Sequence, residues 1–297
     1  MPHMLMLRTA FAAGATTALV GAAALAAAPA GATTASSSYA PSSSVTAQPA
    51  PLNGYRTIIG SPVTVATQTQ GRGTVFCPTG TVPLGGGVII LSADPLISVN
   101  SSFPAQGGWF ADVNNASAND TMIRATVVCA AKPAHYKVVT RLGLANPAAT
   151  HTTVAATCPT GTKPLSGGAA SNSESLFVNL SSTAPTGTRA WQISENNATG
   201  TDHLVSVVAV CGSVKGYAVV HGPAVSVPGN STASLAVNCP SGRRSTGGGT
   251  VISSSSLGAY LNMTTFGNSH NWISSATNTS AIPVNASTTV VCAAVVV

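Results

Sequence analysis

The chain has 297 residues, only 6% of them charged, with 12 Lys and Arg against 6 Asp and Glu and a formal net charge of +6. Because about 25% charged residues is usual for a globular domain, the surface must rely on uncharged polar side chains such as Ser, Thr and Asn. The mild positive excess is spread along the chain, and Arg243–Arg244 is the only adjacent basic pair, which argues against a nucleic-acid-binding protein.

The first 53 residues contain two segments that precede the repetitive part of the chain. Residues 1–32 have the parts of a secretory signal peptide: Arg8 supplies the positive flank, an Ala-, Leu- and Val-rich run follows, and cleavage is expected after Ala30 or Ala32. An uncleaved anchor is the alternative, but alanine is weakly apolar and polar residues interrupt the run. Residues 33–53, rich in Ser, Ala and Pro, are predicted to be a flexible linker. We therefore expect a secreted protein, extracellular or attached to the cell surface, without a transmembrane segment in its mature form.

The rest of the chain repeats itself three times. "CPTG" begins at Cys77 and Cys158 and "CPSG" at Cys239, each 81 residues after the previous copy (158 − 77 = 81; 239 − 158 = 81). Each unit has an opening tyrosine, this cysteine turn, a glycine cluster, one tryptophan and a closing strand that ends in a second cysteine. The units are residues 54–134, 135–215 and 216–297.

Short runs rich in Val, Ile and Thr alternate with turn residues throughout the three units, which predicts an all-β protein with about six antiparallel strands per unit. The closing strand, as in "LVSVVAVC", is apolar on both faces and needs cover on both. Two assemblies fit this pattern: a β-prism-like ring about a pseudo-threefold axis, or three small β-sandwiches. The short connections between units favour the ring.

Six cysteines in an exported chain predict three disulfides. Pairing within units is the simplest arrangement and the one we favour: Cys77–Cys129, Cys158–Cys211 and Cys239–Cys292. A ring that links neighbouring units is the alternative: Cys129–Cys158, Cys211–Cys239 and Cys77–Cys292. A metal site is not expected, because Cys-x-x-Cys pairs and a recurring histidine are missing, and no motif indicates a cofactor.

One tryptophan recurs in each unit, followed five or six residues later by an asparagine. These residues are Trp109, Trp191, Trp272, Asn114, Asn196 and Asn278. The indole faces could stack on sugar rings while the amides bind hydroxyl groups, which would make a carbohydrate-binding surface. Packing of each tryptophan on the disulfide of its own unit is the alternative, and the recurrence at one place in all units favours it.

The inventory of reactive groups favours a non-enzymatic binding module of the extracellular space or cell envelope. The third unit has no Asp or Glu, and the chain has no Gly-x-Ser-x-Gly motif. A polysaccharide or other cell-wall polymer is the expected partner. A hydrolase with a Ser-His-Asp site between units, around Asp202 and His203, is one alternative, and a purely structural coat or matrix protein is another. Nothing in the sequence indicates the oligomeric state.

The segments "VVCAAKPAHYKVV" and "CPTGTKPLSGG" resemble a repeat of uncharacterised secreted proteins of actinobacteria, over nearly all of residues 54–297. The second unit departs from that pattern with Ser166 in place of the first glycine of the cluster. A looser similarity connects the cysteine turn to the vitelline-membrane outer-layer proteins of β-prism fold, whose repeats are shorter. The first resemblance implies a secreted protein without an assigned activity. The second implies a threefold prism and carbohydrate contact, and neither supplies a catalytic residue.

Overall fold

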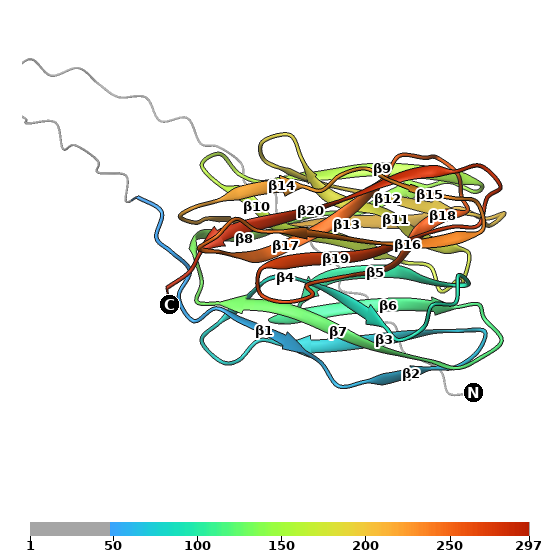
Figure 1. Ribbon diagram of the computed structural model, residues 1–297, viewed down its shortest axis with the longest axis horizontal. Coiled ribbons are helices and arrows are strands. Elements are labelled where there is room, and N and C mark those ends of the chain that lie inside the picture. Colours follow the sequence, from blue (N-terminus) through green and yellow to red (C-terminus); the bar gives the residue numbers. More distant parts are fainter. Residues whose placement is uncertain (1–47, 297) are drawn as a thin grey trace, which may run out of the picture. The chain divides into compact units, whose positions relative to one another are not determined.

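The computed structural model describes residues 48–296 and shows an all-β fold in that part of the chain (Figure 1). The predicted signal peptide and residues 33–47 of the predicted linker lie outside the described residues. The described end of that linker departs from the prediction, because Leu52 is buried in an apolar cluster and bridges to Val295. Across residues 48–296 there are 20 strands, and no helix long and apolar enough to cross a membrane. All pairings between these strands are antiparallel, as predicted.

The three repeats contribute seven, six and seven strands, close to the predicted six. The first contains β1 (Arg56–Ile59), β2 (Val63–Val65), β3 (Thr69–Phe76), β4 (Val82–Ile90), β5 (Ile97–Ala105), β6 (Gly108–Asn115) and β7 (Thr121–Ala130). The second contains β8 (Ala134–Asn146), β9 (Thr150–Thr157), β10 (Lys163–Ser171), β11 (Val178–Thr186), β12 (Ala190–Asn197) and β13 (His203–Ser213). The third contains β14 (Ala218–His221), β15 (Val225–Val227), β16 (Ser231–Asn238), β17 (Arg243–Ile252), β18 (Ala259–Thr265), β19 (Asn271–Asn278) and β20 (Val284–Ala294).

Each of the three sheets is shared between two neighbouring repeats. The strand orders are β1-β7-β4-β18-β19-β16 with β2 beside β7, β3-β6-β5-β10-β13-β8, and β14-β20-β17-β11-β12-β9 with β15 beside β20. Every repeat therefore divides its strands between two sheets. The halves join where β4 pairs with β18, β10 with β5, and β17 with β11. The two predicted assemblies are combined in this topology: each repeat is a sandwich of two half-sheets, and the shared sheets join the three sandwiches in a pseudo-threefold ring.

The disulfides connect the two half-sheets of each repeat. They pair Cys77 with Cys129, Cys158 with Cys211, and Cys239 with Cys292, at Cα–Cα distances of 5.7, 5.6 and 5.8 Å. The predicted pairing within units is thus confirmed, and the ring of disulfides between neighbours is not formed. The glycine that ends each cysteine turn has a positive φ of 83°, 82° or 76° at Gly80, Gly161 and Gly242, a conformation that side chains other than glycine disfavour.

The tryptophans fill the space between the half-sheets. Trp109, Trp191 and Trp272 have no exposed surface. Each indole N–H donates a hydrogen bond at 2.8–2.9 Å to a hydroxyl of its own repeat: Ser102, Thr183 and Thr264. An added Cβ would overlap the indole rings at the second glycine of each cluster: Gly86, Gly167 and Gly248. The glycine clusters are therefore needed, in part, to leave room for the tryptophans.

The other two positions of each cluster lie where repeats meet. A Cβ at Gly87 would overlap the carbonyl oxygen of Thr264, so the bare backbone permits β4 to approach β18. The side chain of Ser166 lies between Gly85 and Gly247, and a Cβ on either glycine would collide with it. One repeat can carry a serine at this position only because the other two carry glycine, which explains the departure of the second unit from the repeat pattern.

Side-chain hydrogen bonds also connect each repeat to the next one around the ring. The opening tyrosines donate hydrogen bonds at 2.8–3.1 Å to carbonyl groups of the preceding repeat: Tyr55 to Ser245, Tyr136 to Pro83 and Tyr217 to Pro164. On β7, Val127 and Val128 are both fully buried although they face opposite sides. Thr126, on the second side, shares a 2.8 Å hydrogen bond with Thr265 of the third repeat. The neighbouring repeat thus supplies the cover that the closing strand is predicted to need.

Candidate functional site

The residues predicted as a sugar-binding surface are all buried in the structure. Asn114 donates to the carbonyl of Val178 at 2.8 Å, and Asn196 to that of Ala259 at 2.9 Å, so both amides join adjacent repeats. Asn278 has a different role, because it bonds the carbonyl of Val227 in its own repeat at 3.1 Å. Its structural equivalents, which make the same contact, are Asn115 and Asn197. Together with the burial of the tryptophans, this leaves none of the six side chains exposed to a ligand.

The structure does not bring the predicted Asp202 and His203 together as an acid–histidine pair. Oδ1 of Asp202 accepts a hydrogen bond from the backbone N–H of Ala148 at 2.9 Å. The Nε2 atom of His203 lies 3.4 Å from the hydroxyl of Ser173 and 3.4 Å from that of Thr201. The serine and histidine therefore meet, but the carboxylate that would orient the imidazole for a hydrolase is directed elsewhere.

The basic residues gather at one end of the strands, which we call the basic end. It is the end with the cysteine turns, and it carries eight basic residues: Arg56, Lys132, Lys137, Lys163, Arg189, Lys215, Arg243 and Arg244. Arg8 lies outside the described residues, so these are eight of 11 described Lys and Arg (12 − 1 = 11). No Asp or Glu of residues 48–296 lies at this end. Basic residues that are spread along the sequence are therefore concentrated in space.

Four of the carboxylates lie in loops at the opposite end, which we call the acidic end: Asp94, Asp120, Glu174 and Asp202. The described loops at that end contain no Lys or Arg. The repeat itself explains part of this segregation, since Arg56 and Lys137 are 81 residues apart, as are Lys163 and Arg244. That spacing is the signal in the sequence from which the basic end could be located.

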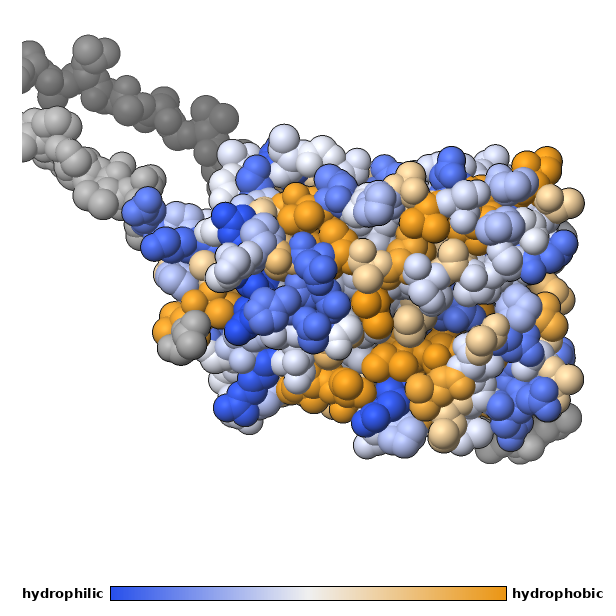
Figure 2. All heavy atoms as spheres, viewed as in Figure 1, coloured by the Kyte–Doolittle hydropathy of each residue, from blue (hydrophilic) through white to orange (hydrophobic). Residues whose placement is uncertain are grey.

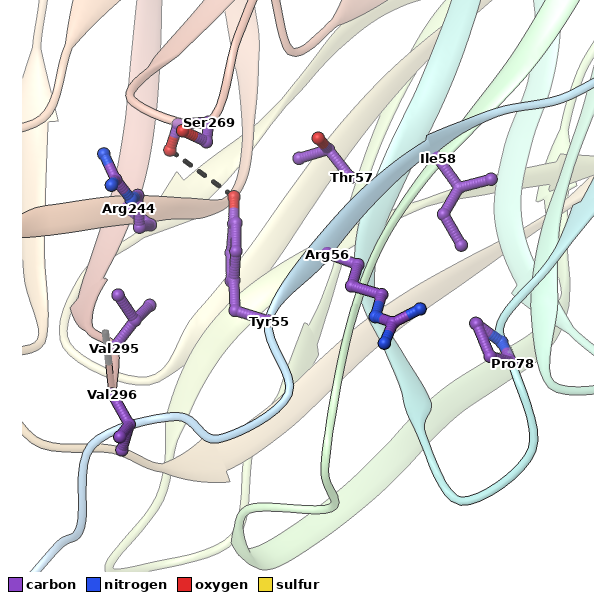
Figure 3. Close-up of a pocket in the computed structure, with 9 residues that line it drawn as sticks. All are labelled: Tyr55, Arg56, Thr57, Ile58, Pro78, Arg244, Ser269, Val295 and Val296. Carbon is purple, nitrogen blue, oxygen red and sulfur yellow. Dashed lines mark hydrogen bonds between the residues drawn. The ribbon is translucent and has the colours of Figure 1, made fainter.

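A cleft of about 530 Å³ opens at the basic end, where the third repeat meets the first (Figure 3). Figure 3 shows Arg56 and Arg244 on opposite sides of the Tyr55 ring. The Tyr55 hydroxyl donates to the carbonyl of Ser245 at 2.8 Å, and burial raises the pKa of this phenol to about 12, so it carries no charge at neutral pH. Arg244 is positioned by a 2.8 Å hydrogen bond from its Nη1 to Nδ1 of His270.

This arrangement suits an anionic group. Two guanidinium groups flank a neutral ring, and an arginine can hold a phosphate, sulfate or carboxylate through two parallel N–H bonds. The corresponding cleft between the first and second repeats, about 350 Å³ in volume, is lined by Tyr136 and Val138 and by no arginine. The repeat thus provides the cleft at more than one junction, whereas the two arginines make one of them a candidate anion site.

An aromatic patch on the shared sheet of the first and second repeats is a second candidate surface. Phe76 is 51% exposed, and its ring centroid lies 5.9 Å from that of Phe110, which in turn lies 6.0 Å from Phe103. Arg72 binds Asp112 through two bonds of 2.6 and 2.8 Å beside this patch. The second repeat has Thr157, Ala184 and Gln192 at the positions of the three phenylalanines. Figure 2 shows that apolar side chains also reach the surface in several separate places.

The described part of the chain contains no candidate metal site, because no three His, Cys, Asp or Glu side chains cluster there in a way that could hold a metal ion.

No protein-family model matches the sequence, and no curated protein matches it either. The candidate sites therefore depend on the geometry and charge of this chain alone.

Proposed function

We propose that this protein is a secreted, non-enzymatic module that attaches to an anionic polymer of the cell envelope through its basic end. The observation that carries the proposal is the segregation of eight basic residues, without a carboxylate, at one end of the described strands. Such a surface attracts a polyanion at long range, and the attraction weakens as salt screens it.

The three disulfides support the proposed extracellular location, because disulfides persist in oxidising environments outside the cytosol. The predicted signal peptide points the same way. An anionic glycan or a phosphate-bearing cell-wall polymer offers repeated charges, so the cleft of Arg56 and Arg244 would hold one group while the remaining cations contact its neighbours. Several weak contacts on one polymer then act together as avidity.

The test compares two pairs of substitutions that each remove two positive charges. In the cleft variant, Arg56→Gln with Arg244→Gln removes both positive charges that line the cleft. In the control variant, Arg124→Gln with Arg141→Gln removes two positive charges in the middle of β7 and β8. Binding is measured by calorimetry or co-sedimentation with polygalacturonate, polyphosphate and neutral dextran over a range of salt concentrations. We expect the parent protein to bind the first two and not dextran, with affinity falling as salt rises.

The cleft variant should bind more weakly, and the slope of log K against log salt should decrease by about one for each anionic group of the polymer that an arginine no longer neutralises. The control variant should retain most of the affinity. Equal binding by both variants, or binding that does not depend on salt, would contradict the proposal.

A neutral polysaccharide bound at the aromatic patch is the second candidate, supported by the exposed phenylalanine cluster beside Arg72 and Asp112. Phenylalanine rings can stack on sugar rings while the ion pair bonds hydroxyl groups. Dextran binding that resists salt and is lost in Phe110→Ser, with the cleft variant unaffected, would favour this candidate over the first.

A further inference from the structure

A hollow of about 340 Å³ opens at the acidic end, and all three repeats line it. Its residues recur at steps of 81: Leu96, Phe177 and Gly258 form one set, and Ser98, Asn179 and Tyr260 form another. Equivalent residues from three repeats surround one point only on the pseudo-threefold axis. We call this hollow the axial bowl.

The axial bowl is apolar and open at its rim. Leu96 is 50% exposed and Phe177 is 62% exposed, although both are large apolar side chains. The floor is held in place by Tyr260, whose hydroxyl donates to the carbonyl of Pro95 at 2.7 Å and whose pKa is raised by burial to about 12. Exposed apolar side chains around a preformed hollow are typical of a surface that docks a partner.

The charges next to the bowl are negative. Asp94 precedes Leu96 by two residues, Glu174 precedes Phe177 by three, and the described loops at this end contain no Lys or Arg. A complementary partner therefore needs positive charge around an apolar projection. Like charges across an interface would oppose docking, so an acidic partner is disfavoured.

The basic end of the same molecule carries positive charge and an exposed apolar side chain beside the axis. Leu52 closes the axis there, in one apolar cluster with Leu84 and Leu165, which occupy equivalent positions one repeat apart. Leu52 pairs with the segment at Val295, and the next residue, Val296, is 57% exposed. The exposed side chains of Lys132 and Lys215 belong to the connections beside this segment. The buried Leu52 cluster, with the exposed Val296 and two exposed lysines beside it, thus marks the axis at the end opposite the bowl.

We propose that copies of this chain associate head to tail along the pseudo-threefold axis, with the axial bowl of one copy receiving the basic end of the next. Such a contact joins two different surfaces, so it leaves a free bowl at one end and a free basic end at the other, and association can continue into an open chain of copies. A copy bound to an anionic polymer through its basic end still presents its bowl, so further copies can attach to it.

The experiment uses two complementary variants of the full mature protein. Asp94→Lys with Glu174→Lys reverses the charge at the bowl, and Lys132→Glu with Lys215→Glu reverses it at the axis of the basic end. Sedimentation velocity is measured as a function of concentration in low and high salt. The parent protein should show a sedimentation coefficient that rises with concentration in low salt and returns to the monomer value in high salt.

Each variant alone should remain monomeric, since one of its two surfaces is reversed. An equimolar mixture should associate again, because the intact bowl of one variant then meets the intact basic end of the other and the two reversed surfaces also carry opposite charges. Unchanged melting temperatures check that both variants are folded. A monomeric parent protein, continued association of both variants alone, or a mixture that forms no complex would overturn the proposal.

Polymer binding gives an independent readout. The bowl variant keeps Arg56 and Arg244 and gains positive charge, so it should bind polygalacturonate or polyphosphate at least as strongly as the parent protein. Loss of association with retained polymer binding therefore separates the two proposals, and either one can fail while the other stands.

Discussion

The carboxyl group of Glu195 is buried in the core, and from this burial we predict that the protein becomes less stable as pH rises toward neutrality. The side chain has no exposed surface, and its Oε2 accepts a 2.6 Å hydrogen bond from Nδ2 of Asn146. The other two repeats have Val113 and Ala276 at this position. Burial in place of solvation raises the pKa of Glu195 from 4.5 to about 8, against the smaller lowering effect of its hydrogen bonds.

The sign of the effect follows from the proton balance. Between pH 4.5 and 8 the folded protein retains the proton on Glu195 and the unfolded chain releases it, so unfolding becomes easier as pH rises. One unit of pKa difference corresponds to about 1.4 kcal/mol. From pH 4.5 to pH 7 the free energy of unfolding should therefore fall by about 3 kcal/mol through this residue.

Glu195→Gln removes the titration and keeps an oxygen to accept the bond from Asn146. Urea unfolding of the parent protein and this variant should give similar stabilities near pH 4.5, with the variant more stable by about 3 kcal/mol at pH 7. Glu174→Gln, at an exposed loop position, is the control and should follow the parent protein. A difference between parent and Glu195→Gln that stays constant with pH, or that favours the parent at high pH, would refute the reasoning.

Two further predictions concern the scaffold. Trp191→Ala should lower the free energy of unfolding by about 3–5 kcal/mol in urea, as the loss of a large buried aromatic does; an unchanged stability would mean that the indole is not part of the core. Gly168→Ala should also destabilise, by more than about 1 kcal/mol, because its Cβ would overlap the carbonyl oxygen of Ser102 where two repeats join. Gly200→Ala, which has open space around the added methyl, is the matched control and should melt like the parent protein.

The parts of the fold that are predictable from sequence are those that local chemistry and the repeat determine together. The 81-residue stride, the turn at Gly80 and the apolar runs predict strands and units. The nearly equal cysteine spacing, 52, 53 and 53 residues, favours pairing within units, such as Cys77–Cys129. The recurrence of the tryptophans, where neighbouring charges do not recur, predicts that they belong to the core. The structure agrees, with Trp109 fully buried.

The exchange of half-sheets between repeats cannot be predicted in the same way. The approach of Gly87 to Thr264 involves residues 177 positions apart (264 − 87 = 177), and no local pattern specifies which strand edge a neighbour will use. The alignment of asparagines is also misleading, because Asn197, not Asn196, lies one 81-residue step before Asn278 (278 − 197 = 81) and makes the equivalent contact. Their recurrence along the chain suggests one binding role for all three asparagines, although Asn114 and Asn196 join adjacent repeats and Asn278 bonds within its own repeat.

Charged side chains lie mostly at the strand ends because the closing strands bury both of their faces. Residues on both faces of the closing strands lie against protein, as Val127 and Val128 do, and charged side chains there would lose their hydration without a partner. Arg72 and Asp112 form the one ion pair that the described strands carry, and they compensate each other. The remaining charges are accordingly found mostly at the strand ends, where water solvates them. Because the repeat places the same strand end on the same side three times, small biases in each unit accumulate into one basic end and one acidic end, the two surfaces on which the proposed binding and association depend.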